Sequence, residues 1–172
     1  WDIDPNKVSV VHLGFDSFKT KPLDEIGRNR ENLPERNFIL YVGNRGGHKN
    51  FDRLLLALAA SKEVRNNFKL VCFGGGSFTE NELLLMNKLR LTQIVMHVDG
   101  NDGVLGKLYR HASLFVYPST YEGFGIPPLE AMSVGCPVST ARSSSIPEVC
   151  GAAVDYFDPY DIDSITESLD RV

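Results

Sequence analysis

Short apolar runs alternate with amphipathic stretches along the chain. Residues 38–42 (FILYV) and 114–117 (LFVY) are wholly apolar or aromatic, which is typical of strands buried on both faces in a parallel sheet. Similar runs predict further strands at residues 8–12, 70–73, 94–98, 136–139 and 153–157. Because strands that alternate with helices form right-handed βαβ crossovers, the pattern predicts an α/β fold with a doubly wound parallel sheet.

The predicted helices are marked by apolar spacing and by capping residues. Asn50 suits the N-cap of a helix in which apolar residues recur three and four positions apart from Phe51 onward. Thr79 and Glu82 have the spacing of a capping box, and this second helix should end near residue 89. Asp102 is expected to be the N-cap of a third helix. Two more are expected, one from residues 127–128 to 135 and one from residue 161 onward.

Composition narrows the class of protein. The 172 residues suffice for one domain, and 42% hydrophobic and 23% charged residues are ordinary for a globular protein. We expect an opening strand and linker at residues 1–36 and the α/β core at residues 37–172. The net charge of −4 argues against a nucleic-acid partner, which needs a basic face. The three cysteines match no zinc spacing and two lie in apolar runs, so we expect reduced thiols, a cytoplasmic protein and no metal site.

The loop after the strand at residues 38–42 carries groups that suit an anion. In a doubly wound sheet, ligands bind beyond the carboxyl ends of the strands. This loop combines three glycines with two cations: Gly43, Arg45, Gly46, Gly47 and Lys49. Together with the N-terminus of the following helix they suit a phosphate group. The P-loop spacing is absent, and the loop taken alone also fits a solvated surface turn.

Two other strand-exit loops are rich in glycine. Gly74–Gly76 could supply the first two glycines of the dinucleotide fingerprint G-x-G-x-x-G, but the last glycine of that motif is absent. The run fits a tight turn as well as a close approach to a ligand. Seven residues separate Glu122 from Glu130, with a glycine-rich turn between them. Carboxylates suit sugar hydroxyls, but Glu122 also fits a solvated turn and Glu130 a favourable charge in the first helical turn. Both this loop and the loop with Lys49 leave the same edge of the sheet, which favours a joint site for phosphate and sugar.

These residues resemble a known family. Residues 117–132 (YPSTYEGFGIPPLEAM), followed by Gly135-Cys136-Pro137-Val138, resemble the signature of retaining glycosyltransferases of group one, glycosyltransferase family four. The loop that ends at Lys49-Asn50 resembles the phosphate loop of that family, and the resemblance covers essentially the whole chain. It implies a GT-B fold, in which two Rossmann-like domains face each other across a cleft. The chain resembles the C-terminal, donor-binding domain.

The resemblance implies a role for each matched residue. Arg45 and Lys49 would bind the diphosphate of a nucleotide-sugar, and Glu122 would face the transferred sugar. Glu130 would hydrogen-bond the ribose hydroxyls. Further donor contacts are implied for Gly43, Gly46, Gly47, Gly74, Val98, Gly123, Phe124, Gly125, Ile126 and Leu129. Many members carry Pro-Arg-Lys before the helix, where this chain has Gly47-His48-Lys49, so that Arg45 stands as the second cation.

The implied reaction transfers a sugar from GDP-mannose or a UDP-sugar to an acceptor hydroxyl with retention, in bacterial polysaccharide or lipopolysaccharide synthesis. The donor is a substrate, and neither a cofactor nor a metal is implied, because cations and helix amides supply the electrostatic stabilisation. A saccharide or lipid-linked acceptor would bind an N-terminal domain that this chain lacks. The isolated domain is therefore expected to be inactive. The resemblance also allows the full-length enzyme to associate peripherally with a membrane.

Three alternatives remain open at this point. A nucleotide-sugar epimerase shares the fold, although the spacing of Glu122 and Glu130 argues against it. A nicotinamide-binding domain is disfavoured because the last glycine of the dinucleotide fingerprint is absent after Gly74–Gly76. A non-catalytic nucleotide-binding domain is disfavoured by the presence of Arg45, Lys49 and both glutamates.

Overall fold

The computed structural model describes residues 4, 9, 14 and 37–171. Residues 37–171 form a six-stranded sheet with helices on both faces. The elements in chain order are β1 (Phe38–Val42), η3 (Gly47–Lys49), α2 (Phe51–Ala60), α3 (Lys62–Asn67), β2 (Lys69–Phe73), α4 (Glu80–Lys88), β3 (Val95–Val98), α5 (Asp102–His111), β4 (Leu114–Tyr117), α6 (Ile126–Ser133), β5 (Val138–Ala141), α7 (Ile146–Cys150), β6 (Asp155–Phe157) and α8 (Ile162–Leu169). Apart from Ser9, the strand expected at residues 8–12 and the linker at residues 20–36 lie outside the described residues.

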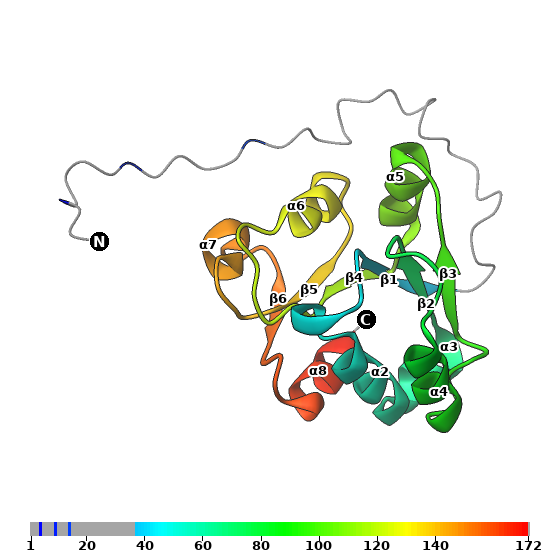
Figure 1. Cartoon of the computed structure of the whole chain (residues 1–172). Helices are drawn as coiled ribbons and strands as arrows, with labels where there is room; N and C mark the ends of the chain where they lie inside the picture. Colours follow the sequence, from blue (N-terminus) through cyan, green and yellow to red (C-terminus); the bar gives the residue numbers. More distant parts are fainter. Residues whose placement is uncertain (1–3, 5–8, 10–13, 15–36, 172) are drawn as a thin grey trace.

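All neighbouring strands pair in parallel, in the order β3-β2-β1-β4-β5-β6. The first described strand, β1, lies in the middle of the sheet. The next two strands, β2 and β3, lie on one side of it, and β4 and the later strands lie on the other side. Helices α2, α3, α4 and α8 cover one face, and α5, α6 and α7 cover the other (Figure 1). The predicted doubly wound α/β fold is therefore confirmed.

The core lies on both faces of the central strand. Ile39 and Tyr41 of β1 pack into the cluster under α2 and α8, whereas Phe38 and Leu40 pack into the cluster under α5 and α6. This alternation follows from the two-residue period of a strand. A strand that is buried on both faces must be apolar throughout, and for this reason residues 38–42 could be recognised as a strand.

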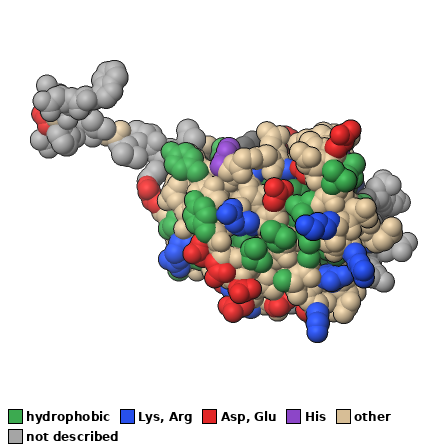
Figure 2. Space-filling model, turned by 60° about the horizontal axis from the view of Figure 1, so that its bottom comes forward, with side chains coloured by type: hydrophobic (Ala, Val, Ile, Leu, Met, Phe, Trp, Pro, Cys, Tyr) green, Lys and Arg blue, Asp and Glu red, His purple; other side chains and the backbone are tan. Residues whose placement is uncertain are grey.

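Figure 2 shows the face of the molecule that contains α2 and α8, where acidic and basic side chains are interspersed. The apolar side of α2 lies beneath this surface, and its leucines (Leu54, Leu55 and Leu58) are fully buried. Burial of each such side chain contributes about 1.5–3 kcal/mol to folding. The packing of α2 therefore holds the loop that precedes it, residues 43–50, against the sheet.

Several boundaries differ from those expected. Asn101, not Asp102, is the N-cap of α5, and its side chain accepts a hydrogen bond from the backbone N–H of Val104 at 3.2 Å. Strand β5 begins at Val138 and not at residue 136, because Pro137 has no N–H for the ladder. Helix α3 was not predicted as a helix, and for α7 the sequence indicates only a loop and a helix cap at residues 143–145. With six and five residues they are too short to show a clear helical period.

The predicted capping box at the start of α4 is confirmed. Thr79 accepts a hydrogen bond from the backbone N–H of Glu82, and the Glu82 carboxylate accepts one from the backbone N–H of Thr79 at 2.7 Å. Both groups are otherwise unpaired at a helix N-terminus, so the box fixes where α4 begins.

We predict that Thr79→Ala lowers the free energy of unfolding by about 1 kcal/mol, the usual cost of losing an N-cap. Urea denaturation measures the change. Thr92→Ala is the matched control, because Thr92 is exposed in a turn, and it should change stability by less than about 0.5 kcal/mol. Equal losses for the two variants would show that the box contributes nothing.

Candidate functional site

The loops that follow β1 and β4 meet at the point of the sheet where the strand order reverses, with β2 and β3 on one side of β1 and β4 on the other. Strands β1 and β4 are neighbours, with Ile39 opposite Leu114, so the loops that follow them leave the same edge side by side. The backbone N–H of Thr120 donates to the carbonyl of His48 at 2.8 Å, which joins the two loops directly. This reversal point is where ligands bind in doubly wound sheets.

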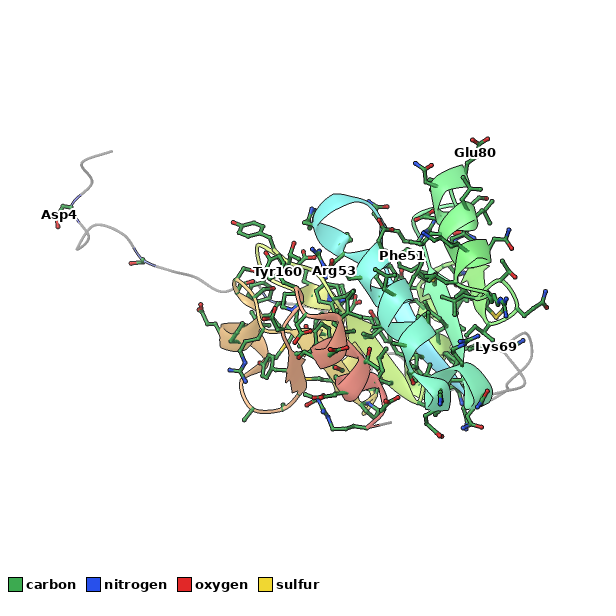
Figure 3. The ribbon with its side chains drawn as sticks, turned by 90° about the horizontal axis from the view of Figure 1, so that it is seen from below. Asp4, Phe51, Arg53, Lys69, Glu80 and Tyr160 are labelled. Atoms are coloured by element: carbon green, nitrogen blue, oxygen red, sulfur yellow. The ribbon has the colours of Figure 1, made fainter. Side chains whose placement is uncertain are left out.

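Asn50 ties three segments together at this edge. Its side-chain N–H groups donate to the carbonyls of Pro118 at 3.1 Å and Pro159 at 2.8 Å. Its side-chain oxygen accepts from Arg53 at 2.9 Å, and the Arg53 guanidinium lies over the ring of Tyr160 (Figure 3). Asn50 occupies the N-cap position of α2 as predicted, but its side chain makes no cap hydrogen bond. It acts as a bridge between loops instead.

Lys49 and Glu122 form an ion pair across the two loops. The Lys49 ammonium lies 2.6 Å from the Glu122 carboxylate, and both side chains are largely buried. Burial alone would raise the pKa of Glu122. Hydrogen bonds from Lys49, Ser119 and Tyr117 outweigh burial, and the pKa of Glu122 lies below its ordinary value. The Glu122 carboxylate is therefore ionised near neutral pH and places its negative charge at the reversal point.

Three consecutive serines hold the backbone of the Glu122 loop. The Ser144 hydroxyl accepts from the backbone N–H of Glu122 at 2.8 Å and donates to its carbonyl at 3.0 Å. Ser145 also donates to that carbonyl, and Ser143 donates to the carbonyl of Ser119. We expected these serines to form a loop and a helix cap, yet Ser145 makes no cap hydrogen bond at the start of α7. The residues that these serines contact lie more than twenty positions away from them in the sequence.

Helix α6 begins at the same edge, with its N-terminus formed by the glycine-rich turn. Gly125 is its N-cap and has a φ of 98°, and a Cβ atom there would lie 2.4 Å from Ile146. Only glycine fits such a position. Gly123 is exposed, and Ile126 opens the helix. The first N–H groups of a helix lack partners within the helix, so this end suits an anion.

Glu130 lies on α6 beside a buried tyrosine. The Tyr109 hydroxyl donates to the Glu130 carboxylate at 3.0 Å. Glu130 is the fifth residue of α6, which has no acidic residue in its first turn. The expectation that it stands in the first helical turn was therefore wrong, because the helix starts at Ile126 and not at the prolines.

Arg45, for which the family resemblance implies a contact with the donor diphosphate, makes its contacts within the protein. Its guanidinium is buried and forms an ion pair with Glu82 at 2.9 Å. Its remaining N–H groups donate to the carbonyls of Gly74 at 3.0 Å, Gly76 at 2.8 Å and Ser77 at 2.9 Å. Hydrogen bonds from Arg45 and Thr79 also hold the pKa of Glu82 below its ordinary value, although burial opposes this. Arg45 therefore links the loop after β1 to the loop after β2.

The three-glycine turn takes its shape around this guanidinium. Gly74, Gly75 and Gly76 all have positive φ, and a Cβ on Gly75 would lie 2.8 Å from the carbonyl oxygen of Gly43. The tight-turn interpretation of these glycines is therefore supported. The same turn follows the end of β3, because the backbone N–H of Gly74 donates to the carbonyl of Val98 at 3.3 Å.

One cavity lies beside this link and not at the Lys49–Glu122 pair. It has a volume of about 580 Å³ and is lined by Asn44, Arg45, Gly46, Gly47, Asn50, Phe51, Asp52, Gly75, Thr79, Asn81, Glu82 and Leu85. Neither Glu122 nor Glu130 reaches it. Of the predicted site residues, the structure brings Lys49, Glu122 and the start of α6 together at the reversal point, whereas Arg45 faces the other side of its loop.

In the part of the chain that the structure describes, no helix is long and apolar enough to cross a membrane. Within the same residues, His, Cys, Asp and Glu side chains nowhere gather in threes as a metal site requires.

Comparison with known proteins identifies the class. Residues 24–172 match the family described as glycosyl transferases group 1, and the chain belongs to that family. It is 37% identical over 140 residues to O-antigen chain mannosyltransferase B of Escherichia coli, covering 80% of this chain and 37% of that protein. It is 32% identical over 182 residues to D-inositol 3-phosphate glycosyltransferase of Salinispora tropica, covering 92% and 38%. The chain thus spans less than half the length of these relatives.

Solved structures agree with this assignment. The crystal structure of WaaG, a glycosyltransferase involved in lipopolysaccharide biosynthesis, superposes with a TM-score of 0.71 at 28% identity, covering 83% of this chain and 39% of that one. A sucrose-phosphate synthase from Thermosynechococcus elongatus gives a TM-score of 0.69 at 24% identity, covering 87% and 39%. The second likeness is one of fold. The predicted Rossmann-like α/β fold is confirmed, and so is the resemblance to group one glycosyltransferases.

We predict that Arg45→Met lowers the free energy of unfolding by about 3 kcal/mol or more in the absence of any ligand, because it leaves the buried Glu82 carboxylate without its cation. Chemical denaturation of the free chain measures the loss. Arg65→Met removes an exposed arginine and should have little effect. An Arg45 variant as stable as the Arg65 control would show that the link is unimportant for folding.

Proposed function

We propose that this chain is the donor-binding domain of a retaining glycosyltransferase, which transfers a sugar from GDP-mannose or a UDP-sugar to an acceptor hydroxyl. One observation carries the proposal. The Lys49–Glu122 ion pair, at 2.6 Å, stands at the reversal point of the sheet in a chain of the group 1 family. A cation, a carboxylate and a helix N-terminus are the groups that a sugar diphosphate requires there.

The diphosphate is assigned to Lys49 and to the N-terminus of α6. The Lys49 ammonium is a compact charge, and a phosphate oxygen of the donor can replace the Glu122 carboxylate as its partner. The backbone N–H groups of Gly123–Ile126, at the start of α6, supply donors and the positive end of the helix dipole. Arg45 has no place in this proposal, because its guanidinium is buried against Glu82 and the carbonyls of the three-glycine turn.

The sugar and the ribose are assigned to the two carboxylates. Glu122 follows β4 next to Lys49 and faces the transferred sugar. Glu130 lies in the second turn of α6 and accepts hydrogen bonds from the ribose hydroxyls. The remaining donor contacts fall to residues of the surrounding loops and strand ends: Gly43, Gly46, Gly47, Gly74, Val98, Phe124 and Leu129.

Electrostatic stabilisation of the leaving group is the main contribution of these residues. The bond between the anomeric carbon and the donor phosphate oxygen breaks, and negative charge develops on the diphosphate. Lys49 and the α6 amides stabilise that charge. The acceptor oxygen forms the new bond to the anomeric carbon, and its proton passes to an oxygen of the departing phosphate. No side chain of this chain is required as a base in this scheme.

The relatives support a role in the synthesis of bacterial polysaccharide or lipopolysaccharide, with mannose as the transferred sugar. The acceptor, a saccharide or a lipid-linked saccharide, is assigned to an N-terminal domain outside this chain. The proposal places the reaction in the cytoplasm, with the full-length enzyme associating peripherally with the membrane that carries a lipid-linked acceptor.

We predict that Lys49→Met weakens binding of GDP or UDP to the chain by at least about tenfold, the usual cost of losing one charge-assisted hydrogen bond. Isothermal titration calorimetry measures the dissociation constants. Lys88→Met, at the exposed end of α4, is the control and should bind as the wild type does. A wild-type chain that binds neither nucleotide, or a Lys49 variant that binds equally well, would contradict the diphosphate assignment.

Glu122→Gln is predicted to act in opposite directions on binding and on transfer. Nucleoside diphosphate should bind about two- to fivefold more tightly, because Lys49 no longer has a competing carboxylate. Sugar transfer by the full-length enzyme should fall by at least about a hundredfold, because the group facing the sugar has lost its charge. Calorimetry and a released-nucleotide assay measure the two effects. Weaker diphosphate binding together with unchanged transfer would contradict both roles.

A further inference from the structure

Each carboxylate of the Glu122–Glu130 segment is met by a buried phenol. The Tyr109 hydroxyl donates to the Glu130 carboxylate at 3.0 Å. On the other side, the Tyr117 hydroxyl hydrogen-bonds the Glu122 carboxylate. The two tyrosines come from different elements, α5 and β4, so this pairing is a tertiary arrangement and not a local motif.

A single aromatic cluster connects the two phenols. The Tyr109 ring meets Phe115 edge to face, with centroids 5.3 Å apart, and Phe115 lies 5.8 Å from the Tyr117 ring. Tyr109 and Phe115 are fully buried. Aromatic rings with only two side-chain torsions lose little further freedom in such packing. The hydroxyl of Tyr109 is thus held in place by the core.

Tyr109 acts as a hydrogen-bond donor over the whole working range of pH. Burial raises its pKa well above the ordinary value of a phenol, and the charge of Glu130 raises it further. The phenol therefore keeps its proton beside the carboxylate. A carboxylate that accepts from a rigid donor on one side presents its remaining lone pairs in a defined direction.

We propose that Tyr109 is a positioning residue for Glu130, which orients the carboxylate so that it accepts hydrogen bonds from the ribose hydroxyls of the donor. This inference rests on the proposed function and deepens it, because it assigns the ribose preference of the site to a residue that never touches the nucleotide. The tyrosine lies in the core of the domain, whereas Glu130 stands on α6 at the edge where the donor is assigned.

The test compares a nucleoside diphosphate with its 2′,3′-dideoxy counterpart. The chain is titrated with GDP and with UDP, and whichever binds is compared with its dideoxy analogue by calorimetry. The wild type should prefer the ribonucleotide by about tenfold or more. Tyr109→Phe should reduce that preference about three- to tenfold and leave the affinity for the dideoxy analogue unchanged. The substitution keeps the ring and its contact with Phe115, and a thermal melt verifies the fold.

Two controls separate positioning from a general effect on structure. Tyr156→Phe removes a phenol that donates to the carbonyl of Gly151, and it should leave the preference unchanged. If Tyr109 acts through Glu130, the double variant Tyr109→Phe/Glu130→Ala should show the same preference as Glu130→Ala alone.

The outcomes are distinguishable. Equal weakening of both ligands in Tyr109→Phe, or an unchanged preference, would overturn the positioning role while leaving the donor assignment intact. A wild type that binds ribo and dideoxy forms equally would overturn the contact of Glu130 with ribose and this inference with it. A wild type that binds neither GDP nor UDP would overturn the proposed function itself.

Discussion

The parallel pairing of β1 with β4 is the constraint on which the rest of the structure depends. Since the chain builds outward from β1 and then returns to its other side, the loops after these two strands must leave the same edge together. That adjacency brings Lys49 to Glu122 although 73 residues separate them. It also sets the N-terminus of α6 beside both side chains. The donor site that we propose at this edge therefore follows from the sheet order.

The two cations of the first loop illustrate how side-chain chemistry divides their roles. Arg45 has a planar fork of donors, and the structure uses that fork to join Glu82 to three backbone carbonyls. Lys49 has a compact ammonium on a flexible stem, paired with a carboxylate near the surface. A buried guanidinium with full hydrogen bonding costs too much to release, whereas a lysine can exchange one anion for another. Within five residues the chain thus has a buried cation that joins two loops and a second cation that is available for the proposed contact with the diphosphate.

Much of the fold could be predicted from the sequence because its signals are local. The β1 run is apolar throughout since both its faces are buried, and the Thr79–Glu82 box is legible as a four-residue motif. Helix α3 was missed and the extent of α7 was not predicted, because five or six residues show no helical period. The placement of Lys49 and Glu122 at one edge of the sheet followed from the loops that carry them, whereas the position of Glu130 within its helix did not. Nor did the bond of Tyr109 to Glu130, because it joins α5 to α6 through tertiary packing.

The donor is proposed to bind between the loops after β1 and β4 and not in the cavity lined by Arg45 and Glu82. Amide chemical-shift mapping of the ¹⁵N-labelled chain during titration with GDP or UDP tests this placement most directly. We predict that the largest shifts fall at Lys49 and at residues 122–126, while Asn81 and Leu85 of the cavity stay unchanged. Shifts concentrated at Asn81 and Leu85, with none at residues 122–126, would contradict this placement of the donor.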